Sequence, residues 1–145
     1  MILLDTNVVS EALKPAPAPQ VIAWLDARFA ECAITSLTVF ELRSGLALLS
    51  SGKRKDTLEN AVSRAIQRFA ARTYAFDAAA AHAAANLFAN ARTQGLAIQQ
   101  MPAKLADLQI AGIATAYGLA LATRNTSDFQ GLGLEIIDPW SDVAS

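Results

Sequence analysis

The sequence predicts an α/β fold, a three-layer α/β/α sandwich around a mainly parallel central sheet. Short apolar segments alternate along the chain with longer segments of helical periodicity, an order typical of strands joined by helices. The chain has 145 residues, of which 53% are hydrophobic. It can therefore bury a core without disulfides, and we expect a single domain over residues 1–145. The expected strands are residues 2–4, 32–35, 73–76, 119–123 and 134–137.

Each expected helix follows from apolar residues that recur with a period of roughly 3.6. Asp77 is placed to cap an alanine-rich helix, and Gly118 to end the helix before the fourth strand. The expected helices are residues 6–13, the segment after Pro19, 36–49, 57–71, 77–92 and 103–117, with a helical turn at 126–130. In the helix at 36–49, the residues expected to point inward are Val39, Phe40, Leu42, Leu46 and Leu49.

Turn-forming residues mark the other segments as loops. Pro15, Pro17 and Pro19 break the chain between the first two helices. Residues 50–52 predict a turn, and we interpret the basic cluster at 53–55 as a solvated continuation of it, with electrostatic guidance of RNA as the alternative. Residues 95–102 are expected to form another loop.

Composition excludes several kinds of protein. The formal net charge is -1, so any affinity for nucleic acid has to come from a local patch or from bound metal. The single cysteine, Cys32, rules out an intramolecular disulfide and, with His82 as the only histidine, argues against a zinc site. His82 lies inside the alanine-rich helix, which leaves no serine–histidine–aspartate set for nucleophilic catalysis.

The N-terminus and the apolar segments indicate where the protein resides. No apolar run approaches the ~18 residues that a membrane helix requires. The opening MILLD has no basic segment of the kind that begins a signal peptide. We therefore expect a cytoplasmic protein without membrane contact.

Three acidic residues occur where a parallel sheet places its binding crevice, at the carboxyl ends of the strands. Asp5 directly follows the first expected strand, and Glu41 lies near the start of the helix after the second. Asp128 follows the fourth strand after a short polar turn. We expect these three carboxylates to lie near one edge of the sheet.

Asp107 carries a separate signal, because it shares a helix face with apolar residues. Ile110, Ala111 and Ala114 lie three, four and seven residues further along that helix. A carboxylate on the sheet-facing side of a helix is costly unless a partner compensates its charge. Lys104, three residues earlier, is one candidate partner, and a metal ion is the other.

Four carboxylates that converge on one crevice would repel one another, and some would take up protons. A divalent cation removes this repulsion, and oxygen ligands favour Mg²⁺ or Mn²⁺. Such an ion can activate a water, polarise a phosphoryl group and stabilise a leaving oxygen. The pattern thus favours metal-assisted phosphodiester hydrolysis, for which the expected metal-binding and catalytic acids are Asp5, Glu41, Asp107 and Asp128.

Each acid also has a purely structural interpretation. The alternatives are an N-cap at Asp5, capping boxes at Thr38-x-x-Glu41 and Asn125-x-x-Asp128, and a solvated Asp107. The neighbouring residues that could orient an acid or a metal-bound water, or instead satisfy helix N–H groups, are Thr6, Asn7, Thr123 and Asn125. Arg124 and Arg43 are candidate contacts for substrate phosphates, or solvated surface residues.

Four segments together resemble the successive motifs of PIN-domain proteins. They are MILLDTNVVSE, TVFELRSG, LADLQIAGIA and LATRNTSDF, in the family's order and spanning nearly the whole chain. The opening and the last segment most resemble the VapC and FitB-like toxins. Two places depart from the usual pattern: Leu108 and Gln109 stand where many relatives have an aliphatic pair, and Ala111 and Gly112 where they often have two alanines.

This resemblance implies a PIN-like fold and an Mg²⁺- or Mn²⁺-dependent endoribonuclease, the toxin of a VapBC-type toxin–antitoxin pair. It implies RNA as the substrate, a cognate antitoxin encoded beside the toxin, and a homodimer. Carried over by position, the metal-binding acids are again Asp5, Glu41, Asp107 and Asp128.

Other functions fit the sequence less well. A phosphoacceptor signalling domain needs an aspartate at the end of a middle strand and a lysine at the end of a late one, where this chain has Thr35-Ser36 and Thr123-Arg124. A haloacid-dehalogenase-type phosphatase needs an acid at the position of Asn7. A catalytically silent PIN-fold binding module remains an alternative, although all four acids are present.

Overall fold

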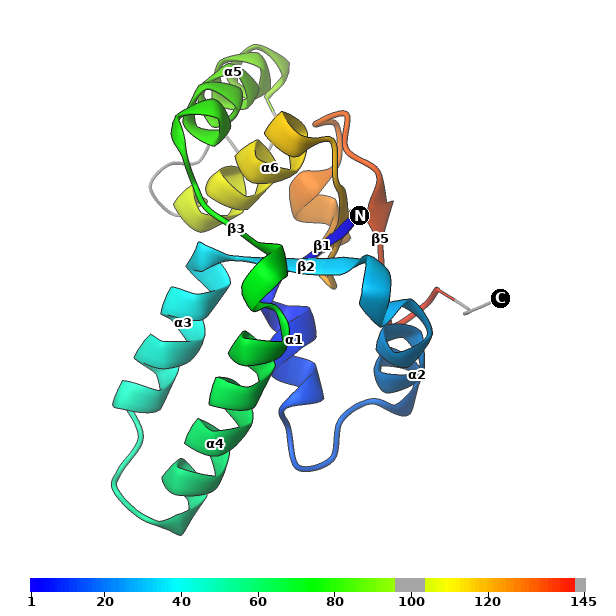
Figure 1. Ribbon diagram of the computed structural model, residues 1–145. Coiled ribbons are helices and arrows are strands. Elements are labelled where there is room, and N and C mark those ends of the chain that lie inside the picture. The colour runs from blue at the N-terminus through cyan, green and yellow to red at the C-terminus, as the bar shows by residue number, and fades with distance from the viewer. Residues whose placement is uncertain (96–103, 143–145) are drawn as a thin grey trace.

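The computed structural model describes residues 1–95 and 104–142, and it has the α/β/α architecture expected from the sequence (Figure 1). Five strands form one sheet in the order β3-β2-β1-β4-β5, and every neighbouring pair is parallel. The strands are β1 (Ile2–Leu4), β2 (Cys32–Thr35), β3 (Thr73–Tyr74), β4 (Ala120–Ala122) and β5 (Ile136–Ile137). This order differs from the 2-1-3-4-5 order of receiver-type signalling domains.

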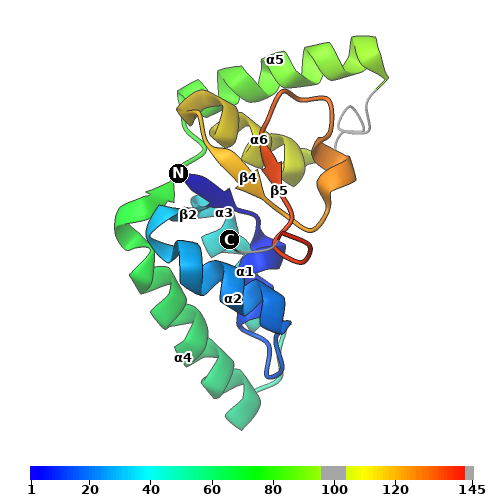
Figure 2. The same cartoon turned by 90° about the vertical axis from the view of Figure 1, so that its right-hand side faces the viewer.

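Helices cover both faces of this sheet (Figures 1 and 2). The helices are α1 (Thr6–Ala12), α2 (Pro19–Arg28), α3 (Ser36–Ala47), α4 (Lys53–Arg68), α5 (Ala78–Gln94) and α6 (Leu105–Tyr117). Short 3-10 turns are η1 (Phe29–Glu31), η2 (Ala70–Arg72) and η4 (Thr126–Phe129). α5 and α6 pack on one face and α1 and α2 on the other, while α3 and α4 extend from the sheet side by side.

The strands alternate their side chains between two apolar cores. Leu3 and Leu121 face α5 and α6, whereas Leu4 and Ile34 face α1 and α2. All four side chains are at most 1% exposed. Because both faces of the sheet are covered, the strands consist of continuous apolar runs, as the sequence shows.

Two expectations on the α3–α4 pair are wrong. Phe40, expected to point inward, is 70% exposed. It lies roughly 200° around α3 from Leu42, and Leu42 and Leu46 are the residues that face α1 and α4. α4 begins at Lys53, so the basic residues 53–55 form its first turn and not a solvated loop.

Of the loop expected at 95–102, only Gly95 lies within the described residues, where it ends α5 in the left-handed conformation.

The α5–α6 contact positions the helix that carries Asp107. A Cβ added at Gly112 of α6 would lie 2.6 Å from the backbone oxygen of Ala80 and 2.7 Å from Cβ of Ala84, both in α5. The glycine in α6 and the alanines in α5 therefore allow a close approach of the two backbones. This explains the departure at Gly112 noted in the sequence.

Within residues 1–95 and 104–142, no helix has the length and apolar character needed to cross a membrane.

Substitution at Gly112 tests this packing. Gly112→Ala is expected to lower the free energy of unfolding by about 1–3 kcal/mol, since the added methyl group meets backbone that cannot easily move. The control is Gly45→Ala in α3, where an added Cβ meets nothing within 4 Å and helix propensity should raise stability by up to about 1 kcal/mol. Urea unfolding of both variants measures the difference, and equal effects would contradict the close approach.

Candidate active site

Asp5 stands at the centre of the candidate site, because it directly follows β1, the middle strand of the sheet. The residue is only 7% exposed. It caps α1, since its Oδ1 accepts a hydrogen bond from the backbone N–H of Thr6 at 2.8 Å. Capping uses one carboxylate oxygen and leaves Oδ2 for partners on the neighbouring strand.

Oδ2 of Asp5 faces the end of β4. The hydroxyl of Thr123, a residue with 0% exposure, donates to it at 2.8 Å, and Nδ2 of Asn7 donates to it at 3.2 Å. Thr123 Oγ1 also accepts from the backbone N–H of Asn125 at 3.1 Å, and Asn7 Oδ1 accepts from that of Arg124 at 3.3 Å. These bonds connect the ends of β1 and β4 and fix the orientation of the carboxylate.

Glu41 approaches the site from α3. Thr35 at the end of β2 caps this helix by accepting from the backbone N–H of Thr38 at 3.1 Å. The alternative interpretation of Thr38-x-x-Glu41 as a capping box therefore does not hold, because Thr35 and not Thr38 is the N-cap. Instead, the hydroxyls of Thr6 and Thr38 share a hydrogen bond of 2.8 Å, and the nearby Thr6 acts to lower the pKa of the Glu41 carboxyl, against the effect of burial.

Asp107 and Asp128 enter the site from the first turn of α6 and from η4. Lys104 lies between them: its Nζ donates to Asp128 Oδ1 at 3.1 Å and is 4.0 Å from Asp107 Oδ2. The partner suggested for Asp107 thus pairs more closely with Asp128. Asn125 makes no side-chain capping bond to η4, so the alternative interpretation of Asn125-x-x-Asp128 as a capping box does not hold either.

The four carboxylates act on one another. Burial raises the pKa of Asp5, and nearby Asp128 raises it further, against the hydrogen bonds it accepts. Burial, then Asp5 and Asp128, raise the pKa of Asp107, and Lys104 lowers it. Partial burial, together with Asp5 and Asp107, raises the pKa of Glu41. The structure therefore brings the four acids expected from the sequence into one electrostatic cluster.

The cluster suits a hydrated divalent cation and not a fully enclosed one. In the described part of the chain, no three Asp, Glu, His or Cys side chains form a ready group for holding an ion. Mg²⁺ keeps several waters and needs only one or two carboxylates. The available donors are oxygen atoms, and the carboxylates repel one another when all are ionised. Both features fit such an ion.

Two candidate substrate contacts, Arg124 and Arg43, interact with other side chains. The Arg124 guanidinium stacks over the Trp140 ring, 5.1 Å from its centre, and Arg43 donates to the Ser63 hydroxyl at 3.3 Å, which links α3 to α4. Sequence reasoning assigned Thr35 no role and missed the second contact of Lys104. The position of Thr35 at the end of a parallel strand was the available signal.

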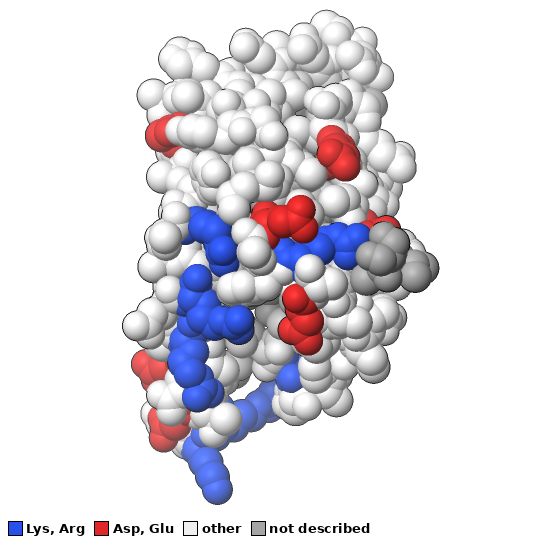
Figure 3. Space-filling model, turned by 45° about the vertical axis from the view of Figure 1, so that its right-hand side comes forward, with Lys and Arg blue, Asp and Glu red and all other residues white. Residues whose placement is uncertain are grey.

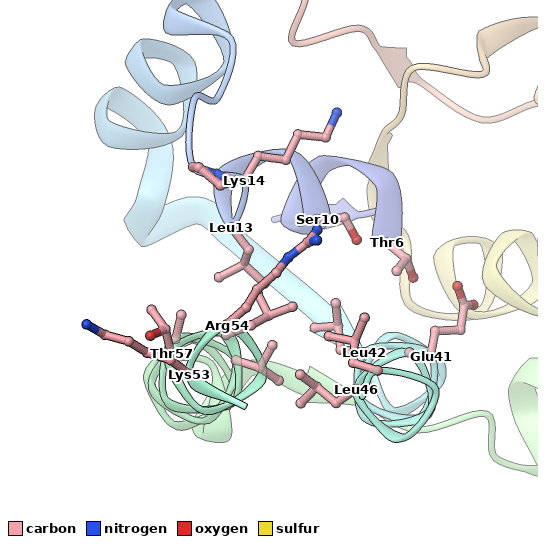
Figure 4. A pocket seen from close by; sticks show the side chains of 16 residues that line it. Thr6, Ser10, Leu13, Lys14, Glu41, Leu42, Leu46, Lys53, Arg54 and Thr57 are labelled. Atoms are coloured by element: carbon pink, nitrogen blue, oxygen red, sulfur yellow. The ribbon is translucent and has the colours of Figure 1, made fainter. Parts of the chain in front are cut away.

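A groove of about 960 Å³ opens beside the cluster, between α1, α3 and α4 (Figure 4). Its walls are mostly apolar and include Leu42 and Leu46. Glu41 and Thr6 lie on one side of the view and Lys53 on the opposite side, while Arg54 extends from α4 toward α1. The groove therefore extends from Glu41 to the basic first turn of α4.

Basic residues are concentrated although the whole chain is not basic. Half of the 12 Lys and Arg residues lie between residues 53 and 72. Figure 3 shows Lys and Arg side chains gathered along the lower part of one face, on the side of α4, while the upper part of that face is mostly uncharged. This is a local basic patch of the kind that a chain of net charge -1 needs for nucleic acid.

Known proteins resemble this chain over almost its whole length. The plasmid stability protein StbB of Pseudomonas syringae pv. tomato is 44% identical over 142 residues, 97% of this chain and 99% of the relative. The VapC ribonuclease Y4jK of Sinorhizobium fredii is 42% identical over 142 residues, 97% and 98% of the two chains. The toxin FitB of Neisseria gonorrhoeae is 40% identical over 144 residues, 98% and 100% of the two chains.

Solved structures of similar proteins have the same fold as this chain. FitAcB from Neisseria gonorrhoeae superposes with a TM-score of 0.87 at 38% identity, over 98% of this chain and 100% of that one. VapBC-5 from Mycobacterium tuberculosis, of the VapBC family of toxin–antitoxin systems, has a TM-score of 0.62 at 26% identity, over 93% and 95% of the two chains. The PIN domain family model matches residues 2–133. The chain therefore belongs to the PIN domain family.

Proposed function

We propose that this chain is the endoribonuclease toxin of a VapBC-type toxin–antitoxin pair, that it requires Mg²⁺ or Mn²⁺, and that it acts in the cytoplasm. The observation that carries the proposal is the buried Asp5 carboxylate with Glu41, Asp107 and Asp128 clustered around it at the carboxyl ends of the strands. The names of the VapC ribonuclease and FitB relatives support the same activity.

The geometry supports distinct tasks for the residues. Asp5 is held by Thr123 and Asn7 in one orientation, so it can bind an ion without reorganising. Asp107 and Glu41 approach it from α6 and α3 and complete the carboxylate set. A divalent ion held by these carboxylates would supply Lewis-acid chemistry and lower the pKa of a water for attack on the phosphodiester. The basic patch beyond the groove would attract the RNA backbone.

The apolar groove supports a protein partner. A partner that covers the groove between α1, α3 and α4 also covers Glu41 and Thr6 at its edge, which would inhibit the enzyme directly. Related solved structures from VapBC toxin–antitoxin systems favour an antitoxin as this partner. The homodimer implied by the family resemblance stays a prediction.

Asp107→Asn tests the metal-dependent activity. The substitution removes one anionic ligand with little change of shape, so we expect loss of Mn²⁺ binding in calorimetry and at least about a 100-fold loss of RNA cleavage. EDTA should abolish cleavage by the wild type. The control is Asp26→Asn, an exposed acid on α2 outside the cluster. Full activity of a metal-saturated Asp107→Asn protein would contradict the mechanism. If the wild type binds its partner but cleaves no RNA, a catalytically silent binding module would be favoured.

The raised pKa of Asp107 predicts how stability depends on pH. The folded protein holds this proton more tightly than the unfolded chain, so the stability associated with it is complete in acid and is lost as pH rises through the raised pKa. Without metal, Asp107→Asn is expected to melt above wild type at neutral pH, with a difference that shrinks as pH approaches about 4. Calorimetric melting measures this, and a difference independent of pH would contradict it.

The groove makes a prediction about the antitoxin. Gly45 lines the groove and has open space around its Cβ position, so Gly45→Trp should fill the groove without straining α3. We expect at least a tenfold loss of affinity for the antitoxin encoded beside the toxin, on the order of what one buried anchor contributes. Gly45→Ala should bind normally. Unchanged binding of the tryptophan variant, measured by calorimetry, would place the partner elsewhere.

A further inference from the structure

Arg124 and Trp140 meet at the edge of the sheet where the acids lie. Figure 2 shows β4 and β5 side by side, and the two strands are parallel neighbours. The backbone N–H of Thr123 donates to the carbonyl oxygen of Ile137 at 2.9 Å, so both strands end at the same level. Arg124 follows β4 and Trp140 follows β5, and the Arg124 guanidinium carbon lies 5.1 Å from the centre of the Trp140 ring.

The segment that carries Trp140 is held firmly in place. The backbone N–H of Trp140 donates to Asp138 Oδ1 at 2.9 Å, and the backbone N–H of Asp142 donates to the Asp138 carbonyl at 2.8 Å. Asp142 Oδ2 accepts from Nε1 of the buried Trp24 at 2.9 Å and lies 3.7 Å from Arg28. The Trp140 side chain also packs against the core beneath α1 and α2. A ring that is already fixed loses little conformational freedom when a ligand binds.

The Arg124 side chain covers this ring and is itself exposed. Its guanidinium is planar and delocalised, and such a group stacks well on aromatic faces. Among residues 1–95 and 104–142, no carboxylate lies within 4.0 Å of the Arg124 guanidinium. One side of the guanidinium is therefore occupied by the Trp140 ring, and the exposed side is available to a ligand.

The stacked pair lies beside the central acid. The backbone N–H of Arg124 donates to Asn7 Oδ1 at 3.3 Å, and Nδ2 of the same Asn7 donates to Asp5 Oδ2 at 3.2 Å. The contact of Arg68 with Phe29 has similar chemistry, but Phe29 precedes β2 and so lies at the opposite, amino end of a strand. Position at the carboxyl edge distinguishes the pair of Arg124 and Trp140.

We propose that Arg124 and Trp140 form a stacking platform for one unpaired nucleobase of the RNA, so that Arg124 contacts a base and not a phosphate. This inference rests on the proposed ribonuclease function and deepens it. Unpaired bases of RNA stack on aromatic side chains and on arginine planes, whereas bases in a duplex are covered by their neighbours. The platform thus selects single-stranded regions or loops, and it tolerates different bases because each has a flat face.

A comparison of two strands with equal charge isolates the contribution of the bases. The full chain, purified free of partner and kept in EDTA, is titrated into a fluorescent oligoadenylate of roughly ten nucleotides. The second probe has the same length and abasic ribose units throughout. The basic patch acts on the phosphates of both strands, so it cancels in the ratio of the two affinities. By fluorescence anisotropy, wild type should prefer oligoadenylate at least about fivefold.

Two substitutions at Arg124 separate its shape from its charge. Arg124→Lys keeps the charge and loses the flat guanidinium, so the preference for oligoadenylate should fall close to one. Arg124→Tyr keeps a flat surface and loses the charge, so the preference should persist. The control is Arg92→Lys, a change of an exposed arginine on α5, which should keep the ratio of wild type.

Three results would overturn the platform. A phosphate contact predicts that Arg124→Lys binds both strands as wild type does, while Arg124→Tyr weakens both equally. A contact with the antitoxin predicts that Arg124→Lys loses affinity for that protein and keeps the ratio of wild type. In either case, RNA cleavage by wild type after addition of Mg²⁺ would leave the nuclease proposal intact. If wild type neither binds nor cleaves RNA, the proposed function is wrong, and the platform with it.

Discussion

Burial of the Asp5 carboxylate at the end of the central strand is the constraint on which the rest of the structure depends. A buried charge is costly unless hydrogen bonds or a counter-ion compensate it. Thr6 and Asn7 of α1 and Thr123 after β4 supply those bonds, so β1 and β4 have to be neighbours and α1 has to begin immediately after β1. The sheet order places its topological switch point, between β1 and β4, at this carboxylate.

The packing of the helices positions the other three acids. α6 can carry Asp107 to the edge of the sheet because Gly112 lets its backbone approach α5 closely. Thr35 caps α3, and Glu41 follows it by six residues, between one and two turns along the helix. The acids thus come from four different elements, and each depends on packing that lies away from the site. This arrangement keeps like charges close together without any of the four being bonded to another acid.

The sequence predicted most elements and all four members of the cluster, because strand ends and helix faces are local properties of the chain. Asp5 follows an apolar run, and Asp107 interrupts an apolar helix face. Contacts between segments that are far apart in the chain could not be predicted from the sequence. The pairing of Lys104 with Asp128 joins residues 24 apart, and the stacking of Arg124 on Trp140 requires the final turn of the chain to fold back. Phe40 was misplaced because its apolar character alone does not reveal that it lies on the exposed side of α3.

The strand order also determines when during synthesis the site can exist. The bond between Asp5 and Thr123 joins residues 118 apart in sequence, and such non-local pairings form slowly and late. A chain emerging from the ribosome presents Asp5 and Glu41 first, and the partners that orient and complete them arrive only with α6 and β4. A nascent or truncated chain therefore lacks an assembled site, and for a toxic enzyme this means that the ribosomes making it are not exposed to active protein until its synthesis is nearly complete.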